Sequence, residues 1–207
     1  MLYLLTLAVP LTISAQQTAQ DYFNHGVKQQ SEGNLDGALA DYNKAIQLKP
    51  DDAEAYFSRG SVKDEKGDKD GALADYNKTI QLKPDDAEAY NNRGLVKIDK
   101  GNFNGALADF NKSIKLKPDY VDAYCNRGHL KYNTNDKDGA LVDFNKAIQL
   151  KPNDAQIYAA RSLVKADKGD ADGAMADCNK AIELGPNDKR FIKLRDYIKS
   201  QTEKAGK

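Results

Sequence analysis

Residues 53–86 read AEAYFSRGSVKDEKGDKDGALADYNKTIQLKPDD, and residues 87–120 repeat this pattern as AEAYNNRGLVKIDKGNFNGALADFNKSIKLKPDY. The proline near the end of this stretch recurs every 34 residues, at Pro50, Pro84, Pro118, Pro152 and Pro186. A fixed period of this length is typical of a repeat array, in which each unit stacks on the next. We therefore predict five units, at residues 19–52, 53–86, 87–120, 121–154 and 155–188.

Each unit has the composition of two helices. In residues 53–86 the first helix should end at Gly67, a residue suited to the left-handed conformation that follows a helix, and Pro84 should stop the second. Asp and Asn are good N-cap residues. The expected caps of the first helices follow the prolines, at Asp51, Asp85, Asp119, Asn153 and Asn187, and those of the second helices are Asn34, Asp68, Asn102, Asp136 and Asp170. Glu54 and Glu88, three residues after Asp51 and Asp85, predict capping boxes.

Aromatic and small residues recur where the two helices of a unit should meet. The first helices carry Tyr22, Tyr56, Tyr90, Tyr124 and Tyr158, with Gly26, Gly60, Gly94, Gly128 and Ser162 four residues later. Glycine has no Cβ and allows close approach of two backbones. In the fifth unit Cys178 replaces the aromatic residue of its column, and we expect it to be a small buried hydrophobe. A single hairpin cannot bury such a face alone, so the units should stack.

On these features the chain resembles the tetratricopeptide repeat family. The helix-turn-helix unit of 34 residues, the Tyr56 and Gly60 pair, Ala72, Tyr76 and the closing Pro84 match the pattern of that family. The resemblance implies an all-α fold, a right-handed superhelical solenoid whose concave face is lined by the first helices. It also implies that this face binds an extended or helical segment of another protein, with no catalysis and no cofactor.

Two columns of the first helices depart from the family pattern. Where the family usually has Leu, this chain has Arg59, Arg93, Arg127 and Arg161, with His25 in the first unit. Lysine follows four residues after each arginine, at Lys63, Lys97, Lys131 and Lys165. An unpaired arginine in a helical interface would cost several kcal/mol. We therefore predict that the arginines contact the equally regular carboxylates of adjoining second helices, Asp41, Asp75, Asp109, Asp143 and Asp177.

Variation among the units concentrates in three columns of the first helices, spaced i, i+4 and i+7 on one stripe. The columns are Phe23, Phe57, Asn91, Cys125, Ala159; Val27, Ser61, Leu95, His129, Leu163; and Gln30, Asp64, Ile98, Tyr132, Ala166. Contact with an irregular ligand requires variation, whereas constant columns such as Asp75 to Lys78 indicate framework. The candidate partner-binding residues are Phe23, Asn24, Phe57, Asn91, Asn92, Asn126, His129 and Tyr132. The alternative for these columns is an unselected solvent surface.

Composition narrows the class of partner. The 207 residues hold 31 basic and 31 acidic side chains, so we expect no general attraction to nucleic acid or to a membrane surface. Asp64, Glu65, Asp99 and Asp167 lie beside the variable stripe, which favours a neutral to basic protein or peptide with apolar anchors. The predicted function is a non-enzymatic binding module that acts as an adaptor or assembly scaffold and is monomeric or weakly self-associating.

Two other functions are considered. One is a structural scaffold that self-associates through its ends or its constant polar face. The other is a catalyst that uses Cys125 and His129, four residues apart on one helix face, but no third group is specified for such a site. The two cysteines also predict neither a disulfide framework nor a metal centre.

The two ends of the chain differ from the repeats. Residues 1–15, MLYLLTLAVPLTISA, are uncharged and apolar, typical of a signal peptide or a hydrophobic leader, although no basic residue precedes the run. A signal peptide would place the protein outside the cytoplasm, periplasmic or secreted; the alternative location is cytoplasmic. At residues 189–207 we expect a capping helix and tail, because Phe191, Leu194 and Ile198 form an apolar stripe among lysines.

Overall fold

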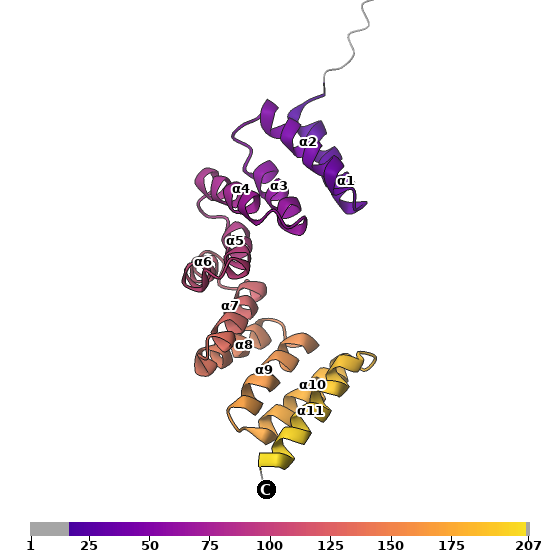
Figure 1. Cartoon of the computed structure of the whole chain (residues 1–207), viewed down its shortest axis with the longest axis vertical. Coiled ribbons are helices and arrows are strands. Elements are labelled where there is room, and N and C mark those ends of the chain that lie inside the picture. The colour runs from indigo at the N-terminus through magenta and orange to yellow at the C-terminus, as the bar shows by residue number, and fades with distance from the viewer. Residues whose placement is uncertain (1–16, 206–207) are drawn as a thin grey trace, which may run out of the picture.

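The computed structural model describes residues 17–205, which form eleven helices and no strand (Figure 1). The helices are α1 Ala19–Ser31, α2 Leu35–Leu48, α3 Ala53–Glu65, α4 Lys69–Leu82, α5 Ala87–Asp99, α6 Phe103–Leu116, α7 Val121–Asn133, α8 Lys137–Leu150, α9 Ala155–Asp167, α10 Ala171–Leu184 and α11 Lys189–Ala205. The predicted all-α solenoid is confirmed. The predicted leader, residues 1–15, lies outside the described residues. None of the described helices combines the length and apolarity that a membrane span needs.

The turns inside the units follow the sequence prediction. Gly33, Gly67, Gly101 and Gly169 have φ between 74° and 83°, and Asn135 takes the same role in the fourth unit with a φ of 67°. Glycine and asparagine tolerate this left-handed region best. The predicted caps of the second helices are also present: each side chain accepts a hydrogen bond from the backbone N–H three residues later, as Asp136 does from Gly139 at 2.9 Å.

The caps of the first helices lie one residue later than predicted. Asp52, Asp86 and Asp154 are the N-caps, whereas Tyr120 caps α7 without a side-chain hydrogen bond. The reason is a turn after each proline, in which the backbone N–H of Asp86 donates to Lys83 O at 3.2 Å and leaves Asp85 outside the helix start. The capping boxes predicted from Glu54 and Glu88 are wrong; a capping box forms between Thr18 and Asp21 instead.

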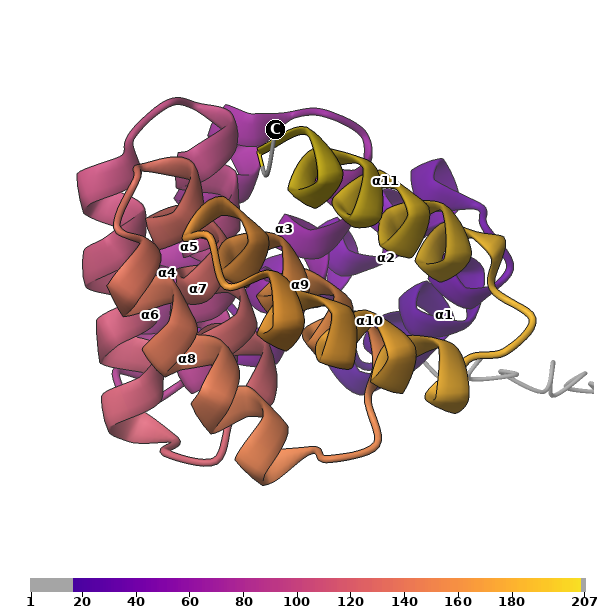
Figure 2. The same cartoon turned by 90° about the horizontal axis from the view of Figure 1, so that it is seen from below.

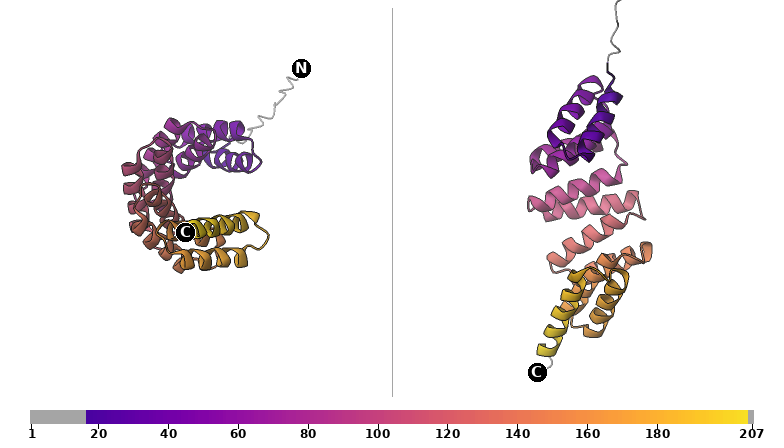
Figure 3. Two further views of the ribbon diagram at one scale, coloured as in Figure 1. Left: turned by 60° about the horizontal axis from the view of Figure 1, so that its bottom comes forward. Right: turned by 90° about the vertical axis from the view of Figure 1, so that its right-hand side faces the viewer.

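The units stack so that the first helices lie inside the curve. Each first helix packs on the second helix of its own unit and on that of the unit before, and also contacts the first helix of the next unit. Among the described residues, no second helix contacts another second helix. The array therefore curves with α1, α3, α5, α7, α9 and α11 on its inner side, as the open ring in Figures 2 and 3 shows.

The core consists of one aromatic ring per unit set against a glycine. Tyr42, Tyr76, Phe110 and Phe144 are at most 1% exposed. A Cβ on Gly94 would lie 2.7 Å from the ring of Phe110, so the helices can approach this closely only because glycine stands there. In the fifth unit Cys178 is fully buried, as predicted, and its Sγ lies 3.4 Å from Ser162 Oγ.

The helix after the fifth unit covers the open end of the array. α11 packs against α10 and α9 (Figure 1), with Ile198 fully buried and Phe191 7% exposed. These two residues are 34 residues after Val164 and Ile157, which are also buried. α11 is therefore placed as a sixth first helix, in the same register as the other five.

Candidate partner-binding groove

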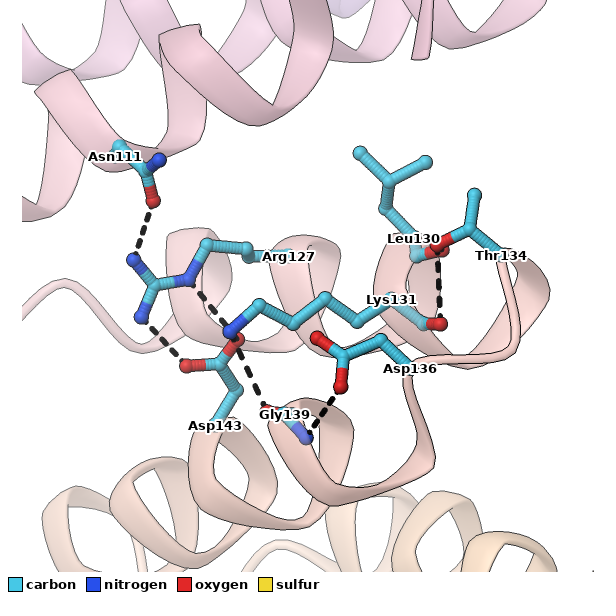
Figure 4. A network of polar contacts seen from close by, with 8 residues as sticks. All are labelled: Asn111, Arg127, Leu130, Lys131, Thr134, Asp136, Gly139 and Asp143. Carbon is cyan, nitrogen blue, oxygen red and sulfur yellow. Dashed lines mark hydrogen bonds and ion pairs between the residues drawn. The ribbon is translucent and has the colours of Figure 1, made fainter. Parts of the chain in front are cut away.

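A repeated polar network holds the first helices in place. In the fourth unit, the Arg127 guanidinium donates to both oxygens of Asp143, Nε at 2.9 Å and Nη2 at 2.6 Å, and Lys131 Nζ lies 2.9 Å from the same carboxylate (Figure 4). The remaining guanidinium nitrogen, Nη1, donates to Asn111 Oδ1 of the preceding unit at 2.6 Å. Asp143 is fully buried, so its charge depends on these two cations.

The network recurs in the second, third and fifth units, as predicted. The pairs are Arg59 with Asp75, Arg93 with Asp109 and Arg161 with Asp177, each at 2.6 Å. In the first unit His25 Nδ1 lies 2.7 Å from Asp41. Each arginine also lies over the tyrosine three residues before it, 5.3 to 5.6 Å from the ring centroid. The asparagine contact between units was not predicted, and it explains why the column of Asn43, Asn77, Asn111 and Asn145 is constant.

The candidate residues of the first variable column lie deeper than expected. Phe23 and Phe57 are half-buried, because their rings pack at 5.7 Å against Tyr42 and Tyr76. Asn91, at the equivalent position of α5, is only 3% exposed. This column faces the second helices more than the groove. The open inner stripe is rotated by one residue and passes through Asn24, Ser58, Asn92, Asn126, Ala160 and Leu194.

Three candidate asparagines come together across two units. Asn126 Nδ2 donates to Asn91 Oδ1 at 2.9 Å, and Asn91 Nδ2 donates to Asn92 Oδ1 at 3.2 Å. Asn24 lies far from them on α1, where it accepts a hydrogen bond from Gln20 at 3.0 Å. The asparagine cluster therefore lies on the inner face of α5 and α7 only, near the middle of the array.

His129 is the centre of the inner face. It lies at the edge of three hollows, of about 220, 280 and 440 Å³, which are lined by α7 together with α5, α9 and α11. Its ring packs edge-on against Phe144, with centroids 5.0 Å apart, although the residue stays exposed on its outer side. Desolvation in this concave setting lowers the pKa of His129 below its ordinary value of 6.5, so the imidazole is neutral at pH 7.

The two other titratable groups near His129 are protonated at neutral pH. Burial raises the pKa of the Cys125 thiol to about 12, and the part of the chain that the structure describes shows no hydrogen bond between Cys125 and His129. Burial and a 2.7 Å hydrogen bond that its hydroxyl donates to Asp167 raise the pKa of Tyr132 to about 12. A thiolate nucleophile is therefore not formed here. Within residues 17–205, no group of three metal-ligating side chains lies close enough to hold a metal ion.

The structure adds groove residues that the sequence did not single out. Phe103, the first residue of α6, is 48% exposed and lines the largest of the three hollows with Leu95 and Ile98. Carboxylates at the second position of α3, α5 and α7 are exposed along one rim of the groove, at Glu54, Glu88 and Asp122. A comparison of the units position by position would have found Phe103, since the equivalent residues are Leu35, Lys69, Lys137 and Ala171.

Comparisons with known proteins agree with this geometry. The family pattern described as TPR repeat matches residues 31–63, 65–98 and 94–135, and two patterns described as tetratricopeptide repeat match residues 121–154 and 155–188. No curated protein matches the sequence.

Several solved structures have the same fold. The MamA protein is 26% identical, with 83% of this chain and 94% of that chain covered and a TM-score of 0.71. YrrB, described as a TPR protein with an unusual peptide-binding site, is 23% identical, with coverage of 86% and 92% and a TM-score of 0.69. PilF of Pseudomonas aeruginosa is 17% identical, with coverage of 91% and 88% and a TM-score of 0.77. From the repeated unit, its stacking and these matches, the chain belongs to the tetratricopeptide repeat family.

Proposed function

We propose that this protein-interaction module binds a segment of a partner protein in the groove on the inner side of α3, α5, α7, α9 and α11, and that it is an adaptor or assembly scaffold rather than an enzyme. The observation that carries the proposal is the set of three hollows that meet at His129. The protonated thiol of Cys125 supports binding over catalysis. The peptide-binding site attributed to YrrB supports a peptide ligand.

The partner segment is neutral to basic and carries apolar anchors. The rim carboxylates Glu54 and Asp122 are exposed and, among the described residues, form no ion pair; Glu88 has a distant one, with Lys117 Nζ at 3.8 Å. The floor between the rims holds exposed or half-exposed apolar residues such as Leu95 and Leu163. Carboxylates beside an apolar floor favour a ligand with the complementary chemistry.

Self-association through the ends is the second candidate, and polar residues on α1 count against it. Asp21 and Lys28 are exposed where α3 has Ala55 and Val62, both 0% exposed and packed toward the preceding unit. Light scattering after size-exclusion chromatography separates the two functions. A groove-binding adaptor is a monomer when pure, whereas a scaffold of this second kind grows with concentration.

The groove proposal is tested by comparing two variants of the third unit in a pull-down read by mass spectrometry. Asn92→Arg places a long cation on the inner stripe, and Ala108→Arg places the same side chain on the exposed face of α6. A groove partner is captured by the wild type and by Ala108→Arg but lost with Asn92→Arg. Partners that both variants capture equally would refute binding in the groove.

A further inference from the structure

The third unit breaks an ionic tie that the second and fourth units make. Lys69 Nζ, at the start of α4, lies 2.6 Å from Asp64 and 2.5 Å from Asp99 of the following unit. The equivalent Lys137 lies 3.8 Å from Asp167. In the third unit these two positions hold Phe103 and Asn133, so both members of the ionic tie are replaced together.

An open apolar hollow stands where the ionic tie would be. Phe103 is 48% exposed and Leu95 is 38% exposed, and with Ile98 they line a hollow of about 440 Å³ that reaches His129. The equivalent residues of the second unit, Lys69, Ser61 and Asp64, are polar. An apolar cluster of this kind, exposed where the same fold can place ions, marks a contact surface.

A second apolar hollow lies on the other side of His129. Leu163 and Ala160 of α9 line it with Phe191 and Leu194 of α11, and its volume is about 280 Å³. α11 therefore does more than cover the last unit, because its inner face extends the groove. The two hollows together form an apolar region from α5 to α11, interrupted by His129.

The charge along one rim changes from end to end. The rim position reads Gln20, Glu54, Glu88, Asp122, Gln156 and Arg190 from α1 to α11, and all six residues are exposed. Arg190 lies 2.6 Å from Asp188, so its charge is compensated. The carboxylates thus flank α3, α5 and α7, whereas the rim beside the second hollow has no net charge.

We propose that the two hollows on either side of His129 receive two apolar side chains of one partner segment, and that the basic residues of this segment lie to one side of these anchors, over Glu54, Glu88 and Asp122. This inference rests on the proposed groove binding and specifies the ligand. The segment is basic at one end and apolar at the other, rather than mixed along its length. Its orientation in the groove follows from that asymmetry.

The test selects ligands from a random peptide library displayed on phage, with the full chain as bait, and measures the affinity of the enriched peptides. We expect sequences with a basic cluster at one end and two large apolar residues toward the other. Phe103→Lys combined with Asn133→Asp copies the Lys–Asp tie of the second unit and should weaken binding about tenfold or more. Because it restores an ion pair, it should leave the urea midpoint unchanged or higher.

Further variants keep the test independent of folding. Leu95→Ser copies Ser61 and removes one anchor contact, with the same expected loss as the double variant. Val142→Ala is the matched control, since Val142 is 64% exposed on α8 and the other units have alanine there. Peptides that bind these variants and the wild type equally but are lost with Asn92→Arg would overturn this inference and leave the proposed function. Peptides insensitive to Asn92→Arg as well, or no enrichment, would overturn both.

Discussion

Asp143 shows how much of the framework depends on single side chains. It is fully buried and accepts contacts from two cations, Arg127 and Lys131, each about one-fifth exposed. Its removal by Asp143→Ala leaves two cations facing an apolar space. We expect a loss of about 3 to 5 kcal/mol in the free energy of unfolding, measured by urea denaturation.

A second carboxylate on the same helix is the control. Asp138 is also paired with a lysine, Lys168, but its side chain is 85% exposed. Asp138→Ala should cost less than about 1 kcal/mol, because exposed ion pairs contribute little. Equal losses for the two variants would contradict the view that the buried network, rather than the number of ion pairs, stabilises the units.

His129 should make stability depend on pH. Desolvation lowers its pKa in the folded protein, so the unfolded chain binds this proton at the higher pH. The stability that neutral His129 provides is complete above about pH 6.5 and is lost as the pH falls below that value toward the folded pKa.

The variant His129→Leu, which copies Leu95 and Leu163, should therefore lose less stability than the wild type between about pH 7.5 and about pH 5.5. Melting temperatures at the two pH values provide the measurement. The carboxylates are common to both proteins, so their contribution cancels in the comparison. An identical decrease in both proteins would show that His129 is not desolvated.

At the scale of helices, the packing of each hairpin couples a glycine to an aromatic ring. A side chain at Gly94 would lie 2.7 Å from Phe110, so Gly94→Ser alone should destabilise the protein by about 1 to 3 kcal/mol. Phe110→Cys alone leaves a cavity, at a cost of about 3 to 5 kcal/mol. The fifth unit already pairs Ser162 with Cys178, so the double variant should be less destabilised than the sum, by about 1 to 3 kcal/mol.

A crossed pair controls for general effects of these substitutions. Gly94→Ser combined with Phe144→Cys joins residues of different units that do not form a glycine–ring pair. Their losses in the urea midpoint should add. Additive losses for Gly94→Ser and Phe110→Cys as well would mean that the relation seen between Ser162 and Cys178 is coincidental.

Helix existence could be predicted from the sequence because period, glycine and proline act locally. Which aspartate caps a first helix could not: Asp51 and Asp52 are both good caps, and the turn after Pro50 decides between them. The same holds for the inner stripe. Phe57 and Ser58 are adjacent in the sequence, and only the packing of Phe57 against Tyr76 shows which one faces the groove.

At the scale of the whole molecule, the curvature brings residues of different units into one surface. His129 lines hollows with residues from Leu95 to Leu194. The sequence ranks His129 only as one member of a variable column, because a comparison between units says nothing of how successive helices converge. The arginines were predictable for the opposite reason, since a charged residue repeated in a helical interface requires a repeated partner.

The ends of the array decide whether it assembles. A first helix packs on the preceding unit through buried residues such as Ala55 and Val62, and α1 has Asp21 and Lys28 at these positions. At the other end α11 covers Cys178 and Ala181, both 0% exposed. A variant with Asp21→Ala and Lys28→Val that also lacks residues 189–207 presents an apolar face at each end. These faces repeat the contact between successive units, so head-to-tail assembly should follow.

Light scattering after size-exclusion chromatography should show a monomer for the wild type and a mass that rises with concentration for this variant. Each change alone leaves one end polar or covered, so neither the α1 substitutions nor the truncation should produce long assemblies. A variant with both ends changed that remains monomeric and helical would mean that the contact between units needs more than its apolar residues. The arginine shared between Asn111 and Asp143 is the contact that the chain has in addition. α1 has His25 at that position, and His25→Arg would then be the change that completes assembly.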